Sequence, residues 1–307
     1  LVEIYRKVLV SKVNDIGKRS NIKKIFKKNN FGLFLTHDVD GVYKYRNTIK
    51  SVLKIILRYS NYDLQDFIRS KKNINNDPWY KGFEILILLS KKYNFKSTYF
   101  FITIIQSKLD NFYKIKDSKI QNILYKLKHD KQFSIEIHGS SNSYNNSIKL
   151  AEEHKVINNS IGVRQHFLKY DISKTGYIQN KYFKYDSTLG FSDVIGFRRG
   201  TCLPFKLFSF GVNKSIELIE IPLNVMDVTL KNNMILDVHD AKTNVLNLIN
   251  IIKEYNGVFT LLWHPGNCCD DWENWIKYFY EPILLHLKNN KVLSLSGQDI
   301  INILGEK

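Results

Sequence analysis

Two aspartates lie two residues apart at the end of an apolar run, in the segment FLTHDVDG (Phe34–Gly41). Because alternate side chains of an extended segment point the same way, Asp38 and Asp40 are expected to face one site, with His37 turned to the other side. Two carboxylates so close together repel each other unless a cation or a shared proton compensates for their charge. The pair therefore indicates either an acidic functional site or, as the structural alternative, a polar turn after a strand.

Histidines and an arginine end several later apolar segments. His138 closes FSIEIHG, Arg164 and His166 lie two apart in GVRQHFL, and His264 closes VFTLLWHP. An imidazole across from a carboxylate pair suits a mixed nitrogen and oxygen site for zinc or a similar metal, whereas a lone histidine is commonly a hydrogen-bonded structural residue. For His166, the sequence leaves three roles open: a metal ligand, a substrate contact or a packed side chain.

Arg164 and His264 suggest two further roles. An arginine stays charged and can fix a carboxylate such as that of Asp38, or it can form a purely structural salt bridge. Histidine ordinarily titrates near neutral pH, so His264 at a strand end suits a general acid. Trp263, directly before it, is expected to pack in the core or to contact a sugar.

The segments that carry these residues alternate with helical ones. Runs rich in β-branched and aromatic residues predict strands at 31–36, 96–103, 133–139, 162–168 and 257–265, with shorter ones at 182–188, 194–200 and 215–223. Helices are expected near 43–59, 79–94, 120–129, 147–160, 241–255 and 272–287. This alternation predicts parallel βαβ units in a barrel or a doubly wound sheet, whose active sites lie at the carboxyl ends of the strands.

The formal net charge of the 307-residue chain is +17. This charge reflects either a composition rich in Lys, Asn and Ile or an attraction to polyanions and anionic membranes. In residues 1–30, basic and apolar residues interleave at helical spacing, which predicts a helical segment that packs on the domain or lies on a membrane surface. Residues 31–307 are expected to form one domain. No nucleic-acid-binding motif is found, so a specific nucleic-acid partner is not expected.

The cysteines and the apolar runs indicate the cellular compartment in which the protein is expected to act. Three cysteines, Cys202, Cys268 and Cys269, form neither a disulfide framework nor a spaced metal-binding pair. The first residues do not have the pattern of a signal peptide, and no apolar run is long enough to cross a bilayer. These features predict a cytoplasmic protein, free or peripheral at the inner face of the membrane.

Taken in order, these segments resemble the polysaccharide deacetylase superfamily, also called carbohydrate esterase family four or NodB-homology domains. LTHDVDG is similar to the first motif of the family, KSTYFFI to its second strand, EIHGSSNSY to its second motif, VRQHFLKYD to its third and TLLWHP to its fifth. THDVD, VRQH, YDSTLGF, GFRRGTC and WHP together resemble a branch often found with bacterial surface-polysaccharide genes. The resemblance runs from about residue 31 to residue 265 and implies a distorted (β/α)7-type barrel with a divalent metal, usually zinc.

The resemblance also implies roles for individual residues. Asp38 matches the general base of the family, Arg164 the residue that orients this base, and His264 the general acid. Asp40 and His138 match two metal ligands.

This sequence departs from the family pattern at the third ligand. Asn142 replaces the second histidine of the second motif, and His166 replaces the proline of the third. We expect His166 to supply the third ligand from the neighbouring strand, with Asn142 as the alternative.

The resemblance implies a hydrolase that removes an N-acyl group, N-acetyl above all, from a sugar used in O-antigen or capsule biosynthesis. A nucleotide-linked or lipid-linked sugar would bring phosphates to a basic protein, and Arg198 and Arg199 are candidates to contact them. Asp186 and Trp263 are further candidate substrate contacts. The alternatives are an amidohydrolase that acts on a small non-sugar amide, and a degenerate, non-catalytic carbohydrate-binding relative.

Overall fold

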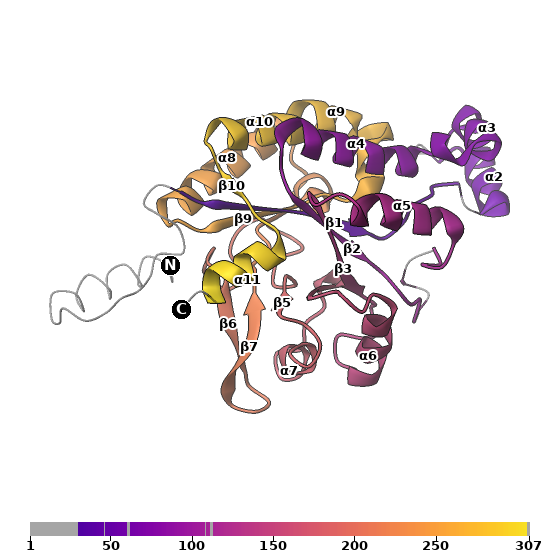
Figure 1. Cartoon of the computed structure of the whole chain (residues 1–307). Helices are drawn as coiled ribbons and strands as arrows, with labels where there is room; N and C mark the ends of the chain where they lie inside the picture. Colours follow the sequence, from indigo (N-terminus) through magenta and orange to yellow (C-terminus); the bar gives the residue numbers. More distant parts are fainter. Residues whose placement is uncertain (1–29, 46, 60–61, 108, 111–112, 306–307) are drawn as a thin grey trace, which may run out of the picture.

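A computed structural model describes residues 30–45, 47–59, 62–107, 109–110 and 113–305 of the chain (Figure 1). The predicted basic helical segment at residues 1–30 thus falls, but for Asn30, outside the described residues. The described part contains one sheet with strands β1 (Gly32–Val39), β2 (Ser97–Phe101), β3 (Phe133–Gly139), β4 (Gly162–Gln165), β5 (Tyr185–Asp186), β6 (Phe205–Ser209), β7 (Lys214–Glu220), β8 (Val225–Met226), β9 (Val258–Leu262) and β10 (Leu293–Ser294).

The strands follow the order β6-β7-β5-β4-β3-β2-β1-β9-β8, and β10 pairs with the first residues of β1. Neighbouring strands are parallel except β6 and β7, which are antiparallel. The sheet is curled, and β1 lies between β2 and β9 and is buried along its whole length (Figure 1). This arrangement confirms the distorted barrel of parallel strands.

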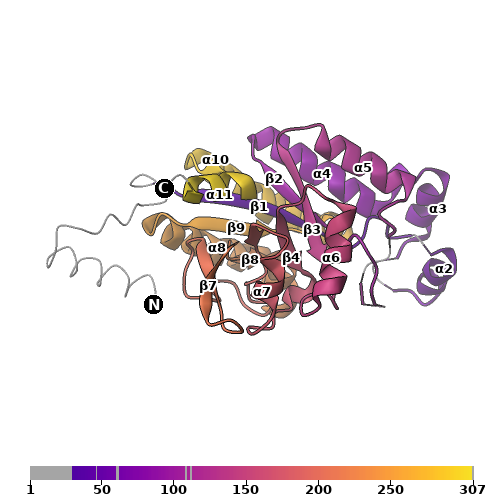
Figure 2. The same cartoon turned by 60° about the horizontal axis from the view of Figure 1, so that its bottom comes forward.

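The helices are α2 (Thr48–Ile56), α3 (Leu64–Lys72), α4 (Pro78–Tyr93), α5 (Ser118–Lys128), α6 (Ser147–Val156), α7 (Thr175–Gln179), α8 (Val238–Glu254), α9 (Glu273–Trp275), α10 (Glu281–Asn289) and α11 (Gly297–Gly305). A π-helical turn at Ile276–Tyr280 joins α9 to α10. In Figure 2, α4 and α5 cover one side of the curled sheet and α6 and α7 lie at another. Most helices therefore lie outside the strands, as parallel βαβ units require.

Helix α4 shows how local sequence sets these bounds. The side chain of Asp77 accepts a hydrogen bond from the backbone N–H of Trp79, and Pro78 occupies the first turn, where its missing N–H costs nothing. The helix ends where Asn94 takes a left-handed conformation with φ 55°. The predicted end of this helix at Asn94 is confirmed.

Two clusters of buried side chains hold the barrel together. One joins α4, α8 and α10 to β1 and β9, with Leu35, Leu261 and Trp263 fully buried in it. The other joins Phe34 and Tyr185 on the strands to Ile300 on α11. Since β10, which precedes α11, pairs with the start of β1, α11 packs at the amino ends of the strands and leaves their carboxyl ends open for a site.

Three sequence predictions differ from the structure. The strand expected at 162–168 ends at Gln165, and His166–Leu168 form a 3-10 turn. Residues 194–200 form no strand, because Gly196 and Gly200 adopt positive φ angles and break the extended run. The helix expected at 43–59 begins only at Thr48, where the side chain of Asn47 caps it. Helices α3 and α7 and strand β6 were not predicted. No helix in the described part of the chain is both long enough and apolar enough to cross a membrane.

Candidate metal-binding and catalytic site

The candidate residues meet where neighbouring parallel strands end. Asp38, His138 and Arg164 belong to the last residues of β1, β3 and β4, and β3 and β4 pair with His138 opposite Arg164. Asp40 and His166 follow β1 and β4 directly. The carboxyl ends of parallel strands lie on one edge of a sheet, so residues far apart in sequence are brought together there.

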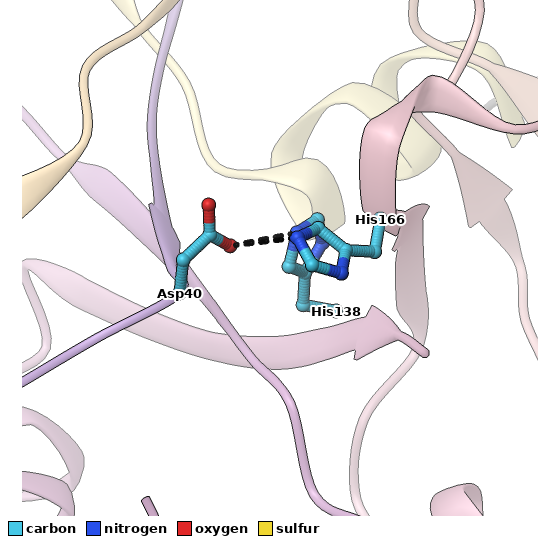
Figure 3. Close-up of side chains that lie close together, drawn as sticks. All are labelled: Asp40, His138 and His166. Atoms are coloured by element: carbon cyan, nitrogen blue, oxygen red, sulfur yellow. Dashed lines mark ion pairs between the residues drawn. The ribbon is translucent and has the colours of Figure 1, made fainter. Parts of the chain in front are cut away.

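Asp40, His138 and His166 form a compact group of three potential ligands. The Oδ1 atom of Asp40 lies 3.3 Å from Nε2 of His138 and 3.6 Å from Nε2 of His166. One ligand atom from each residue lies within 4.8 Å of the others. Figure 3 shows both imidazoles turned toward the Asp40 carboxylate. The expectation that His166 reaches the site from the neighbouring strand therefore agrees with the geometry.

The far nitrogen of each imidazole is held by an acceptor. Nδ1 of His138 donates to the backbone carbonyl of Arg164 at 2.8 Å, and Nδ1 of His166 donates to Oδ1 of Asp110 at 3.3 Å. When a ring is neutral, the proton on Nδ1 leaves the Nε2 lone pair facing Asp40, as a metal ligand requires. Metal-bound histidines are commonly oriented in this way by a carbonyl or a carboxylate.

Asp110 was not predicted from the sequence. Its buried carboxylate also accepts hydrogen bonds from the backbone N–H groups of Ser141 at 2.6 Å and Gln106 at 3.1 Å. Burial raises the pKa of Asp110, but the hydrogen bonds from Ser141, His166 and Gln106 outweigh burial and hold the pKa below its usual value. Asp110 is therefore an ionised anchor for the ring of His166.

These donors fit a divalent metal. Oδ1 of Asp40 is buried and has no hydrogen-bond partner among the described residues, although 43% of the side chain is exposed. A buried anionic oxygen without a hydrogen-bond partner, beside two imidazole nitrogens, is a position that a divalent cation would stabilise. One carboxylate and two histidines are a ligand set that zinc and similar metals accept, with a further position left for water or substrate.

Arg164 holds the other aspartate of the pair. Its Nη1 donates to Oδ1 of Asp38 at 2.8 Å and to the hydroxyl of Thr36, and its Nε donates to the carbonyl of Ser187. Arg164 is fully buried and Asp38 is 2% exposed. The second oxygen of Asp38, Oδ2, lies 3.8 Å from Nε2 of His138 and so faces the ligand group. Asp38 is thus fixed through one oxygen and turned to the site with the other.

His264 flanks the group from the other side. Its Nδ1 donates to Oδ1 of Asp227 at 2.7 Å, its backbone N–H donates to the same carboxylate, and its Nε2 lies 3.6 Å from Oδ2 of Asp40. Asp227 was also missed, although it directly follows β8, and an acid at a strand end is the signal that identified Asp40. The strand predicted at 215–223 stopped short of Asp227, and residues 224–227 received no assignment.

Charges around the group shift the pKa values in opposite directions. For His264, burial lowers the pKa, but the carboxylates of Asp227, Asp40 and Asp38 raise it to about 10. For Asp40, burial raises the pKa, but the neighbouring rings of His138, His264 and His166 hold it well below the usual range. Burial and the charge of His138 lower the pKa of His166. The arrangement favours an ionised Asp40, a neutral His166 and a protonated His264.

The remaining candidates lie apart from this group. Asn142, the alternative third ligand, is exposed in the turn after β3, and Arg198 and Arg199 are half-buried, with Arg198 bonded to the carbonyl of Gly190. Asp186 and Trp263 are each 0% exposed, so Trp263 packs in the core, one of its two expected roles, and neither side chain is open to a substrate in this structure.

Local contacts explain the burial of these two side chains and confirm the expected position of His37. Asp186 accepts a hydrogen bond from Thr188, and Trp263 packs between Trp272 and Phe279. The ring of His37 is turned away from the site, as expected, and bonds to the carbonyl of Trp263 at 2.8 Å.

No family model matches the chain, and no curated protein matches it. Solved structures match it in fold. A structure described as "putative polysaccharide deacetylase from Mycobacterium smegmatis" has a TM-score of 0.58 and 14% identity, with 90% of each chain covered. The structure of Puue allantoinase has a TM-score of 0.57 and 11% identity, with 94% of this chain and 95% of that chain covered.

A structure from Bordetella bronchiseptica, described as a "putative polysaccharide deacetylase involved in o-antigen biosynthesis", has a lower TM-score of 0.41 and 13% identity, with 89% and 88% covered. The two matches with higher scores confirm that the chain has the expected fold, shared with structures described as a deacetylase and an allantoinase.

Proposed function

We propose that this chain is a metal-dependent hydrolase that removes an N-acyl group, most readily N-acetyl, from a sugar used in bacterial surface-polysaccharide biosynthesis (O-antigen or capsule). One observation carries the proposal. Two imidazole Nε2 atoms and a carboxylate oxygen converge between an arginine-held carboxylate, Asp38, and an aspartate-held imidazole, His264. The fold shared with a structure described as a polysaccharide deacetylase supports the same reaction class.

Asp40, His138 and His166 are the residues that would hold the metal. When bound there, a divalent metal supplies Lewis-acid activation of the acyl carbonyl and of the attacking water. The carboxylate of Asp110 and the carbonyl of Arg164 keep the two imidazole rings in place for this task.

Asp38 is proposed as the general base. Arg164 occupies Oδ1, so Oδ2 is the oxygen left to take a proton from the attacking water. The ion pair also keeps the carboxylate from rotating away from the site. A positioned base of this kind typically accelerates a reaction by about 10²- to 10⁴-fold.

His264 is proposed as the general acid. Asp227 holds the Nδ1 proton, so Nε2–H faces the site beside Asp40 and can be given to the nitrogen that leaves when the C–N bond breaks. The pKa of about 10 means that the ring carries this proton at neutral pH. One residue, Asp38, thus accepts the proton from water, and another, His264, donates a proton to the amine. The products are a carboxylic acid and an amine.

A second candidate is hydrolysis of a small non-sugar amide. The observation that favours it is the fold shared with an allantoinase over nearly the whole of both chains. The same base, acid and metal ligands would serve either substrate, so the choice depends on what the rim of the site admits.

For the sugar, we propose a nucleotide or lipid carrier whose phosphates meet the half-buried Arg198 and Arg199. The proposed place of action is the cytoplasm or the inner face of the membrane. Membrane contact through residues 1–30 stays a prediction, because these residues lie outside the described part apart from Asn30.

The test measures metal content and amine release together. We expect the purified protein to hold about one divalent metal per chain and to release amine from a nucleotide-linked N-acetyl sugar. His166→Ala is expected to lose both. His239→Ala is the matched control, since His239 is exposed and lies in a separate acidic group with Asp237 and Asp240.

Three outcomes would contradict parts of the proposal. Unchanged metal content in His166→Ala would remove His166 from the ligand set and make Asn142→Ala the next variant. Amine release from a small cyclic amide, and not from the sugar, would favour the second candidate. A metal-free wild-type protein that still binds sugar would identify a degenerate carbohydrate-binding relative.

A further inference from the structure

Helix α2 buries a polar side chain and exposes its apolar ones. Ser51 is 3% exposed, whereas Ile49, Leu53 and Ile56 are 75%, 51% and 67% exposed. The three exposed residues are spaced four and three apart and so share one face of the helix. A helix that packs on a protein core shows the opposite pattern, so this face is unpartnered within the described chain.

Helix α3, the next element, repeats the pattern. Ser70 is 3% exposed, whereas Leu64 and Ile68, one turn apart on the helix, are 53% and 44% exposed. Leu57 and Tyr59 extend the apolar surface beyond the end of α2. Single exposed apolar residues are ordinary on a protein surface, but a cluster on consecutive elements indicates an interaction site.

Basic residues accompany these apolar side chains. Lys50, Lys54 and Arg58 lie on or directly after α2, and no acid occurs from Asn47 to Tyr59. Helix α3 ends with Arg69, Lys71 and Lys72. An apolar helix face flanked by lysine and arginine matches the chemistry of an anionic lipid surface. A second copy of this chain, which has a formal charge of +17, would be repelled by the same charges.

The pair of helices is attached firmly at the edge of the site. The carboxylate of Asp77, which precedes α4, accepts hydrogen bonds from the backbone N–H groups of Lys44 and Tyr45, which precede α2. These bonds join the two ends of the segment that contains α2 and α3. The Tyr45 hydroxyl bonds to both the N–H and the carbonyl of Asp63. Gly41, next to Asp40, packs so closely on Trp79 that a Cβ would clash with the indole.

In Figure 1, α2 and α3 project from the side of the molecule toward which β1 runs. Because β1 ends at the ligand group, a surface that binds α2 and α3 would lie on the same side of the molecule as Asp40, His138 and His166.

We infer that the surface formed by α2 and α3 docks this protein on an anionic lipid bilayer and so brings its candidate site to the membrane. Docking itself does not depend on the reaction. Its consequence rests on the proposed function: of the two carriers proposed for the acylated sugar, a lipid in that membrane is preferred to a soluble nucleotide.

The test is co-sedimentation of the full chain with vesicles of phosphatidylcholine, with and without phosphatidylglycerol. We expect binding to the vesicles that contain phosphatidylglycerol, weaker binding at high salt, and at least about tenfold weaker partitioning for Ile49→Ser/Leu53→Ser/Ile56→Ser. Leu88→Ser/Ile148→Ser/Ile251→Ser is the matched control, because these side chains are 64%, 74% and 44% exposed on other helices. The control variant is expected to partition like the wild type.

Two results would overturn the inference. Equal partitioning of the α2 variant and the wild type would show that this surface does not dock on lipid. A wild-type dimer in sedimentation velocity that the α2 variant dissociates would instead make the surface an interface between copies.

Amine release from a soluble N-acetyl sugar separates this inference from the proposed function. The α2 variant should keep the wild-type rate, because none of its three substitutions touches the ligand group. Loss of vesicle binding with a normal rate supports docking, whereas vesicle binding without any amine release would contradict the proposed function and leave docking intact.

Discussion

Two pairs of neighbouring acids lie on this sheet, and of these two only one makes ion pairs with basic side chains among the described residues. Asp38 and Asp40 lie at the end of β1, where Arg164 and two imidazoles reach them from other strands. Asp186 on β5 and Glu220 on β7 lie opposite each other in parallel register. Their hydrogen-bond donors are uncharged, namely the hydroxyl of Thr188 and the backbone N–H of Leu189.

The two pairs resolve their charge repulsion in different ways. Burial raises the pKa of Asp186 to about 6, and burial together with the charge of Asp186 raises the pKa of Glu220 well above its usual value. The raised pKa values favour a proton on this pair, which removes the repulsion between the two carboxylates. In the other pair, cationic and imidazole groups keep Asp40 ionised, and the half-exposed carboxylate is open to solvent. A perturbed pKa therefore identifies a functional site only when its causes include accessible, converging partners.

Removing the charge of Asp38 should have the largest effect. Asp38→Asn keeps an oxygen for Arg164 but cannot take a proton, so turnover should fall by about 10²- to 10⁴-fold while metal content stays at the wild-type level. Steady-state amine release and metal analysis of the same sample check this. Full activity of Asp38→Asn would show that Asp38 takes no part in the reaction, as expected of Asp186 and Glu220.

Replacing Asp110, which holds the ring of His166, should have the next largest effect, and this effect should be on metal affinity. Asp110→Asn leaves a weaker acceptor for Nδ1 of His166, so metal affinity should fall by about 10- to 100-fold. Competition with a chelating dye measures the affinity. An unchanged affinity would mean that the orientation of His166 does not depend on Asp110.

Glu153 is a third buried acid, and it tests what burial does without a cationic partner. It accepts hydrogen bonds from the N–H of Ser140 and the amide of Gln106, and burial raises its pKa to about 7. Because the folded-state pKa lies above the unfolded value, its contribution to stability is greatest in acid and is lost as the pH rises through about 7.

Urea unfolding of the wild type and of Glu153→Gln at several pH values should show this pH dependence of the wild type. Relative to the variant, the wild type should lose about 2 kcal/mol of unfolding free energy between about pH 5 and about pH 8. Parallel pH profiles for the two proteins would mean that Glu153 has an ordinary pKa.

The second acid pair should give the smallest effect. In Asp186→Asn, the amide oxygen can still accept from Thr188 and the amide nitrogen can donate to Glu220. Turnover and metal content should stay within about twofold of the wild type, as expected for a residue that does not contact the ligand group. A hundredfold loss of turnover would return Asp186 to the site.

The parts of the fold that follow sequence periodicity were predictable. The strand FSIEIHG was predicted with the bounds that β3 has, because its apolar run and its terminal glycine mark both ends. The same rule, a polar residue after a buried strand, predicted Asp40, His138 and His264 as neighbours. The pairing of their distant strands, which brings them together, follows from parallel topology.

Residues placed by loops were not predictable in this way. Asp110 lies between β2 and α5, where the described residues form no helix or strand, so no periodic pattern indicated its side-chain position. Asp186 and Trp263 were assigned to the substrate because they end or follow strands, but alternate residues of a strand face opposite sides, and both side chains face the packed layer. The left-handed backbone conformations of Phe167 and Leu168, with φ 60° and 51°, were not indicated by any sequence pattern either.

The origin of the two imidazoles has a consequence for redesign. His138 lies on β3 and His166 directly follows the adjacent strand β4, so the pairing of β3 with β4 helps to set the spacing of the rings. The turn at residues 140–146 carries neither of them. Graft libraries that vary the exposed positions of this turn, such as Asn142, should alter selectivity while leaving the inner coordination geometry unchanged. The protein thus offers a scaffold in which recognition and reactivity can evolve separately.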